Sequence, residues 1–209
     1  MIVLALDTCL TACSVAVIDG ERVLASSREV MARGHQERLA PMARDTMAQA
    51  GLTFDWLERI GVTVGPGSFT GLRVGIAFAK GLASALGLPA VGVGTLEAMA
   101  AEATGVAFAV IDARRDQVYI QGFAGGRALM GPEALAAPVA AARIAELVSG
   151  RPFALIGSSG ALVAGLAPGA TLIDSDGADA RQVARLAAGR TPGPLKPIYL
   201  RAPDAKLPS

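Results

Sequence analysis

Hydrophobic residues at the start of the chain form short continuous runs that are typical of buried strands. Residues 2–6 are all apolar and residues 12–18 nearly so, and each run predicts a strand. The dipeptide Asp19-Gly20 favours a hairpin turn, after which residues 22–28 are expected to pair with the second strand. Because Asp7 interrupts the first run and no basic residue precedes it, this run indicates a buried strand rather than a signal peptide.

Two later segments have the three-to-four spacing of helices. Residues 36–50 place apolar side chains on one face, with Pro41 in the first turns. Residues 72–86 predict a second helix, which ends at the Gly-Leu-Pro sequence over 87–89. The other elements expected here are strands over 60–64 and 90–93 and a helix over 96–103 with Thr95 as its N-cap.

The pattern of the first strands then occurs again. Residues 108–111 predict a strand that ends at Asp112, and residues 117–123 predict its hairpin partner, as in the strand that ends at Asp7. The sequence further predicts a helix over 139–148, a strand over 153–156 and a helix over 180–188. This alternation favours an α/β protein with two duplicated lobes, one over residues 1–103 and one over 104–209.

Composition limits the classes of protein that fit. Of the 209 residues, 52% are hydrophobic, which is enough for a substantial core. The 19 basic and 18 acidic side chains give a net charge of +1, whereas a chain that binds nucleic acid by itself usually has a marked basic excess. Mean hydropathy is +0.47, but Gly and Pro interrupt the longest charge-free stretches, so we expect a soluble protein without a membrane span.

Cys9 and Cys13 are four residues apart. This is not the spacing of a zinc or redox pair, and no second pair is present to complete a metal site. We therefore predict two buried free thiols in a reducing compartment.

The most informative motif is the glycine-rich segment over 65–75, which we call the glycine loop. It joins a predicted strand to a predicted helix, and free backbone N–H groups at such a helix N-terminus can hold an anion. It lacks the Gly-Lys-Ser/Thr of a phosphate-binding P-loop, and Arg73 is the only nearby cation. A tight turn capped by Ser68 or Thr70 and a phosphate site are the two interpretations.

The helix after this loop has small residues at every fourth position. We call this set the inner stripe: Gly71, Gly75, Ala79, Ala83 and Gly87. Glycine inside a helix costs up to about 1 kcal/mol relative to alanine, so a close neighbour should compensate for it. That neighbour is either another part of this chain or a partner protein.

Several motifs together resemble the TsaB (YeaZ) family. They are Asp7-Thr8 after the first strand, His35 at the first helix, the glycine loop, Ile111-Asp112-Ala113-Arg114, and Pro197-Ile198-Tyr199-Leu200-Arg201. The resemblance spans essentially the whole chain and is loosest between residues 125 and 191. It implies a two-lobed actin-like (ASKHA, ribonuclease H-like) fold in a cytoplasmic protein of tRNA threonylcarbamoyladenosine (t6A) synthesis.

The resemblance also implies partners. It implies that the chain binds TsaD directly, works with TsaE and tRNA in one complex, and forms a homodimer. The surface that the family uses would lie on the first two helices, at His35, Leu39, Met42, Thr46, Met47, Gly71, Gly75, Ala79 and Ala83. A vestigial nucleotide site would comprise Asp7, Thr8, Gly65, Gly67, Ser68, Thr70, Asp112 and Gly157.

No catalytic residue is predicted in this chain. His35 is the only histidine, so the two-histidine metal site of TsaD relatives is impossible here, and neither Ser68 nor Ser158 lies in a Gly-x-Ser-x-Gly motif. The turn over residues 8–14 carries no cation for phosphate. We expect a scaffold that needs no cofactor. Residual weak nucleotide binding and an autonomous actin-like ATPase or kinase are the alternatives left open.

Overall fold

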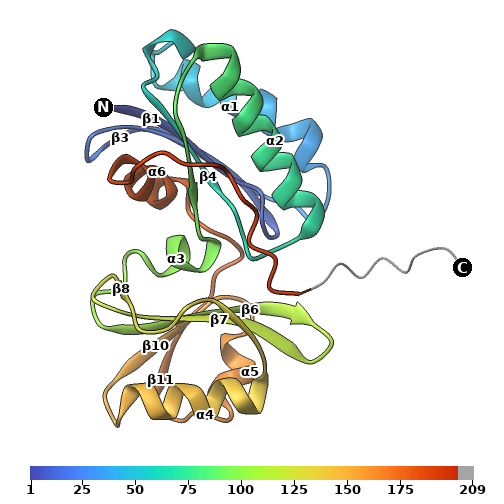
Figure 1. Cartoon of the computed structure of the whole chain (residues 1–209), viewed down its shortest axis with the longest axis vertical. Helices are drawn as coiled ribbons and strands as arrows, with labels where there is room; N and C mark the ends of the chain where they lie inside the picture. Colours follow the sequence, from blue (N-terminus) through green and yellow to red (C-terminus); the bar gives the residue numbers. More distant parts are fainter. Residues whose placement is uncertain (202–209) are drawn as a thin grey trace, which may run out of the picture.

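A computed structural model describes residues 1–201, which form two mixed β-sheets with helices on both faces of each (Figure 1). The first sheet has the order β3-β2-β1-β4-β5. Its strands are β1 (Ile2–Asp7), β2 (Ala12–Asp19), β3 (Arg22–Val30), β4 (Arg59–Thr63) and β5 (Ala90–Val93). Strand β2 pairs antiparallel with both β1 and β3, and β4 and β5 run parallel to β1.

The second sheet repeats this plan. Its order is β11-β10-β6-β7-β8, and β9 also pairs with β7. The strands are β6 (Val106–Arg114), β7 (Gln117–Ala124), β8 (Arg127–Ala128), β9 (Glu133–Ala136), β10 (Phe153–Ile156) and β11 (Ala170–Ile173). The antiparallel hairpin β6–β7 and the parallel strands β10 and β11 correspond to β1–β2 and to β4 and β5. The predicted repeat of the strand pattern is confirmed.

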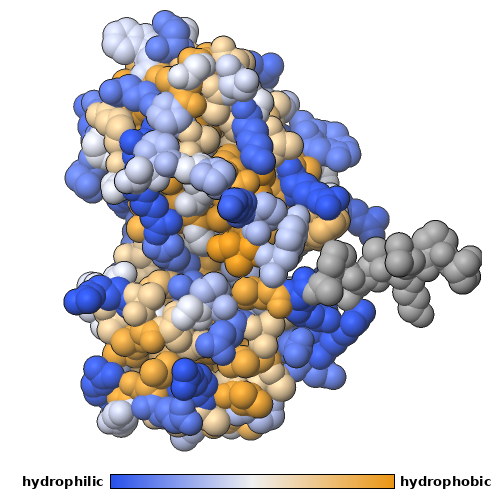
Figure 2. Space-filling model, in the orientation of Figure 1, coloured by the Kyte–Doolittle hydropathy of each residue, from blue (hydrophilic) through white to orange (hydrophobic). Residues whose placement is uncertain are grey.

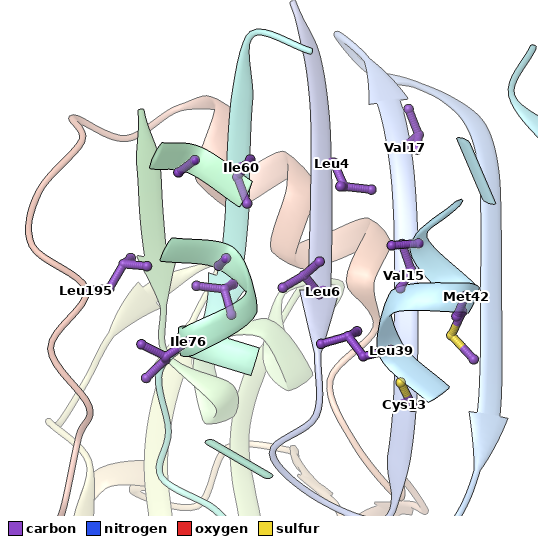
Figure 3. Close-up of a cluster of buried hydrophobic side chains, with 14 of the residues drawn as sticks. Leu4, Leu6, Cys13, Val15, Val17, Leu39, Met42, Ile60, Ile76 and Leu195 are labelled. Atoms are coloured by element: carbon purple, nitrogen blue, oxygen red, sulfur yellow. The ribbon is translucent and has the colours of Figure 1, made fainter. Parts of the chain in front are cut away.

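Helices α1 (His35–Gln49) and α2 (Phe69–Leu86) cover one face of the first sheet. Between them in the chain, the short 3₁₀ helix η1 (Phe54–Trp56) follows α1. Figure 3 shows Leu39 of α1 beside Leu6 of β1, and Met42 of α1 and Ile76 of α2 belong to the same core cluster. In the second lobe α4 (Ala137–Val148) and α5 (Gly160–Ala164) cover the corresponding face. Each sheet therefore has its own apolar core.

The other two helices lie between the sheets and cross over. Helix α3 (Thr95–Ala100) comes after the first sheet but packs on β6 and β7 of the second, where Leu96 and Ile111 share a core. Helix α6 (Ala180–Ala188) comes after the second sheet but packs on β1, β2 and β4 of the first. The predicted second unit, 104–209, thus includes a helix that belongs by packing to the first sheet. The exchange ties the two lobes together.

Local chemistry explains where several predicted elements differ from the structure. Helix α3 begins at Thr95 itself, with Gly94 at the N-cap, so the predicted capping role of Thr95 is wrong. Helix α2 begins at Phe69, three residues earlier than predicted, because Ser68 caps it. Helix α2 is also long and apolar enough to cross a membrane, but it contributes to the core of the first lobe.

Both cysteines are free and buried, as predicted. Burial raises the pKa of the Cys9 thiol to about 12, and burial likewise raises that of Cys13 to about 11. We expect neither thiol to react with an alkylating reagent at pH 8 in the native protein, because the thiolate is the reactive form. Mass spectrometry after a brief iodoacetamide pulse should find two added groups only when urea is present. Rapid labelling of the native protein would contradict this burial.

Candidate functional site

A cleft of about 1400 Å³ lies between the two lobes. One wall carries the glycine loop and the first residues of α1, including His35. The opposite wall carries Asp112 and Arg114 from the β6–β7 hairpin together with Ser158 and Ser159. Residues 174–176 and 198–201 complete the lining. The structure thus brings elements of both repeats to one site.

The glycine loop is held against the turn between β1 and β2. The Ser68 backbone N–H donates to the carbonyl of Cys9 (2.7 Å), and the Thr8 hydroxyl donates to the carbonyl of Gly71 (2.7 Å). The contact is so close that a Cβ on Gly71 would lie 2.0 Å from the carbonyl oxygen of Thr8. Ser68 also accepts a hydrogen bond from the Gly71 N–H (3.3 Å), which confirms the predicted cap. Part of the anion-binding capacity of the loop is therefore used internally.

Asp7 is fully buried and does not line the cleft. Its Oδ1 accepts hydrogen bonds from the Thr63 hydroxyl (2.6 Å) and from the Cys9 backbone N–H (3.1 Å). Its Oδ2 makes no hydrogen bond of normal geometry, although the backbone of Ala178 favours the charged form. Burial outweighs these groups and raises the pKa of Asp7 above its ordinary value.

The segment around Gly177 covers this carboxylate, since a Cβ there would lie 3.2 Å from the Asp7 Oδ2. Asp112 is the second carboxylate of the predicted nucleotide site. Unlike Asp7, it lies in the cleft, and its side chain is 55% exposed. Asp112 accepts a hydrogen bond from the Arg114 backbone N–H (2.8 Å), as expected for a strand-end carboxylate. The two predicted carboxylates thus lie in different environments, and Asp7 has no path to a ligand in the cleft.

Gly157, also predicted for the nucleotide site, is positioned by the fold. Its φ is +121°, and a Cβ would lie 2.5 Å from the carbonyl oxygen of Val110. Gly65 is similar: its φ is +102°, and a Cβ would lie 2.9 Å from the carbonyl oxygen of Ile198. Both glycines are explained by close approach of backbone segments within the chain. No bound ligand is needed to explain why glycine occupies these two positions.

The cleft carries charged side chains of both signs. Arg33, Arg114 and Arg201 line it, together with Glu37 and three aspartates, so its charges are nearly balanced. Within residues 1–201 no group of three or more His, Cys, Asp or Glu could hold a metal ion. Arg28 of β3, which interacts electrostatically with Asp7, forms an ion pair with Asp176. The cleft is large enough to enclose a small molecule.

The predicted partner surface requires correction. The apolar residues assigned to it on α1, together with Thr46, are buried in the first core, as are the inner-stripe residues Gly71, Gly75, Ala79 and Ala83. Thr46 bonds to Ser27 and to the carbonyl of Met42. Of the predicted set, His35 and Gly71 line the cleft. Gly71 and Gly75 of the inner stripe are therefore explained by close packing within this chain, whereas Gly87 is the exposed C-cap of α2 with a φ of +65°.

A second row of α2 was missed. Arg73, Ala77, Gly81 and Ala85 are all exposed, and we call them the outer stripe. A Cβ on Gly81 would meet nothing within 4 Å, so packing in this chain does not explain that glycine. Figure 2 shows apolar patches with hydrophilic residues between them over the region where Figure 1 draws α2. The four-residue spacing of the outer stripe was a signal in the sequence, but the longer inner stripe obscured it.

The sequence of this chain is similar to those of known proteins. The family model described as TsaD, tRNA N6-adenosine threonylcarbamoyltransferase, matches residues 23–152. The chain is 36% identical over 211 residues to an uncharacterized protein of Mycobacterium tuberculosis, covering 98% of this chain and 93% of that protein. It is 42% identical over 125 residues to the tRNA threonylcarbamoyladenosine biosynthesis protein TsaB of Escherichia coli, covering 57% of this chain and 53% of TsaB.

The structural comparison extends the match to both lobes. YeaZ from Pseudomonas aeruginosa superposes with a TM-score of 0.83 and 31% sequence identity, covering 95% of this chain and 99% of YeaZ. The predicted actin-like fold is thereby confirmed, together with the duplicated two-sheet plan. On its sequence and on its fold, the chain belongs to the TsaB/YeaZ family.

Proposed function

We propose that this chain is the non-catalytic partner subunit of a complex that transfers threonylcarbamoyl to adenosine 37 of ANN-decoding tRNAs. It binds a TsaD protein directly, and TsaE joins the same complex. The observation that carries the proposal is the exposed outer stripe of α2, whose Gly81 has open space around it. Small residues on an exposed helix allow a second helix to approach closely, and this offsets the cost of the glycine.

The flanks of the outer stripe suit a protein partner. Val74, Phe78 and Leu82 are partly buried at the edge of the first core and present apolar surface beside the stripe. Phe69, 41% exposed, begins the helix with the guanidinium of Arg73 at 3.7 Å from its ring centroid. Aromatic and arginine side chains around a small apolar centre are typical of protein interfaces. A homodimer through the same surface would compete with TsaD.

The cleft supports the non-catalytic part of the proposal. Asp7 is buried with a raised pKa, and the turn after β1 packs on the glycine loop where an ATPase would hold phosphate. The chain therefore needs no cofactor of its own. With a net charge of +1 it contacts tRNA through the complex rather than alone.

A second candidate function rests on the size of the cleft. A volume of about 1400 Å³ beside the N-terminus of α2 could hold a nucleotide, so weak binding without hydrolysis is compatible with the scaffold role. An autonomous ATPase or kinase would instead bind ATP saturably with Mg²⁺ and turn it over. Calorimetric titration of the isolated chain, followed by a phosphate-release assay, distinguishes these cases.

The deciding experiment is reconstitution. The chain and TsaD from the same organism are purified together, and t6A formation is measured with TsaE, ATP, threonylcarbamoyl adenylate and tRNA, with and without this chain. We expect a stable complex and modification that falls at least about tenfold without the chain. Absence of both association and dependence would overturn the proposal.

A further inference from the structure

The segment over residues 195–201, which we call the strap, crosses the molecule after α6. Figure 1 shows it leaving the first lobe and descending toward the second lobe, where the β6–β7 hairpin lies. It has no helix or strand of its own, yet its residues are fixed at both ends by specific contacts. Such a segment can add a link between the two lobes.

On the first lobe the strap is bound to the glycine loop. Leu195 is buried in the first core, in the same cluster as Ile76 of α2 and Ile60 of β4 (Figure 3). The Ile198 backbone N–H donates to the carbonyl of Val64 (2.7 Å), and its own carbonyl lies over Gly65. The strap is thus part of the packing that holds the start of α2.

On the second lobe the strap ends at the tip of the β6–β7 hairpin. The Arg201 guanidinium donates to the carbonyls of Ala113 and Arg114, the second at 3.2 Å. This tip is strained, since Arg114, Arg115 and Asp116 all have φ between +53° and +63°. Three successive non-glycine residues in the left-handed region are unfavourable unless surrounding contacts hold them. Arg201 supplies such a contact.

The strap also touches α2 at its exposed end. The ring of Tyr199, 45% exposed, lies 5.7 Å from that of Phe69, the first residue of α2. The Arg73 guanidinium of the outer stripe covers the same Phe69 ring. One continuous set of contacts therefore runs from the outer stripe through Phe69, Tyr199 and Arg201 to the opposite wall of the cleft.

We infer that the strap is a latch that holds the cleft at its present width. Through it, contacts made on the outer surface of α2 affect the width of the cleft. The exchanged helices α3 and α6 and the Arg28–Asp176 pair join the lobes within the molecule. The strap joins them across the cleft lining, through Arg201. A protein that docks on Phe69 and Arg73 changes the contacts of Tyr199. This in turn changes the contact of Arg201 with the tip of the β6–β7 hairpin. This second part rests on the proposed function.

The latch itself is tested on the isolated full chain, without any partner. Arg201→Ala removes the contact across the cleft, and Lys196→Ala, an exposed position on the same segment, is the control. Hydrogen exchange of peptides that cover residues 112–118 should accelerate by about tenfold or more in Arg201→Ala, because the lost bonds involve a charged donor. Exchange in β1 and β4 and in the control should match the wild type.

A distance measurement gives an independent reading. Spin labels at Ser84→Cys on α2 and Ala142→Cys on α4 report the separation of the lobes, since both positions are exposed and both native thiols are buried. We expect a broader distribution with longer distances in Arg201→Ala. Unchanged hairpin exchange and unchanged distances would overturn the latch. Accelerated exchange throughout the chain would also overturn it, since the strap would then serve only general stability.

The connection to the partner surface is a separate arm. TsaD added to the wild-type chain should change hairpin exchange at residues 112–118, and Tyr199→Ala should reduce that change while the complex still forms. A complex that forms without any effect on the hairpin rejects the connection but leaves the latch and the proposed function intact. Failure of the complex to form rejects the proposed function, whereas the measurements on the isolated chain still decide the latch.

Discussion

Gly71→Ala is expected to prevent stable folding, whereas Gly81→Ala, ten residues along the same helix, is expected to increase stability. A Cβ on Gly71 would lie 2.0 Å from the Thr8 carbonyl oxygen, a backbone atom that cannot move without displacing the turn after β1. That turn is held by the Cys9–Ser68 and Thr8–Gly71 hydrogen bonds. We expect a loss on the order of 4 kcal/mol or more in the free energy of unfolding.

At Gly81 the same substitution meets open space. Alanine there removes the cost of a glycine inside a helix, so we expect a gain of about 0.8 kcal/mol. Urea unfolding followed by circular dichroism measures both variants against the wild type. A Gly71→Ala protein with wild-type stability would show that the packing of the glycine loop on Thr8 is incorrect. A destabilised Gly81→Ala protein would show that the outer stripe is buried in the free chain.

Gly71 and Gly81 show which structural features the spacing of residues in a sequence predicts and which it does not. The four-residue spacing correctly predicted that one face of α2 carries small residues, but it did not say what lies against that face. The neighbour of Gly71 is Thr8, more than sixty positions away, and only the parallel pairing of β1 with β4 brings them together. Helix positions follow from local pattern, whereas the identity of a neighbour depends on the fold.

The strands of the first lobe were predicted well for a physical reason. Strands β1 and β2 are buried on both faces, so they appear as continuous apolar runs with clear turn residues between them. The structure adds α5 and β11 in the second lobe, which the sequence did not predict. Helix α5 is only five residues long, and β11 is an edge strand with three exposed residues, so neither has a strong apolar pattern.

The candidate site was predicted only in part, because its assembly is non-local. The glycine loop and Asp112 do face one cleft. Asp7 does not, since the chain around Gly177 returns from the second lobe and covers it. The crossing of α3 and α6 has the same origin: each helix has a normal amphipathic pattern, and nothing in that pattern states which sheet it will cover.

The largest effect on function is expected for Gly81→Arg. Arginine at this position projects from the exposed face of α2, so the free chain should fold normally. In a complex it would occupy the space that close helix approach requires, and its charge would be desolvated. We expect the dissociation constant for TsaD to rise at least about 100-fold, and t6A formation to fall in proportion at limiting concentrations.

Ala142→Arg is the matched control, since it places the same side chain on the exposed face of α4 in the second lobe. Unfolding curves, size-exclusion chromatography with light scattering, and titration against labelled TsaD are measured for both variants. Loss of TsaD binding together with loss of any homodimer would mean that both partners use the outer stripe and therefore compete for it. Normal TsaD binding by a folded Gly81→Arg protein would exclude α2 as the contact surface, because no close helix packing could accommodate that side chain.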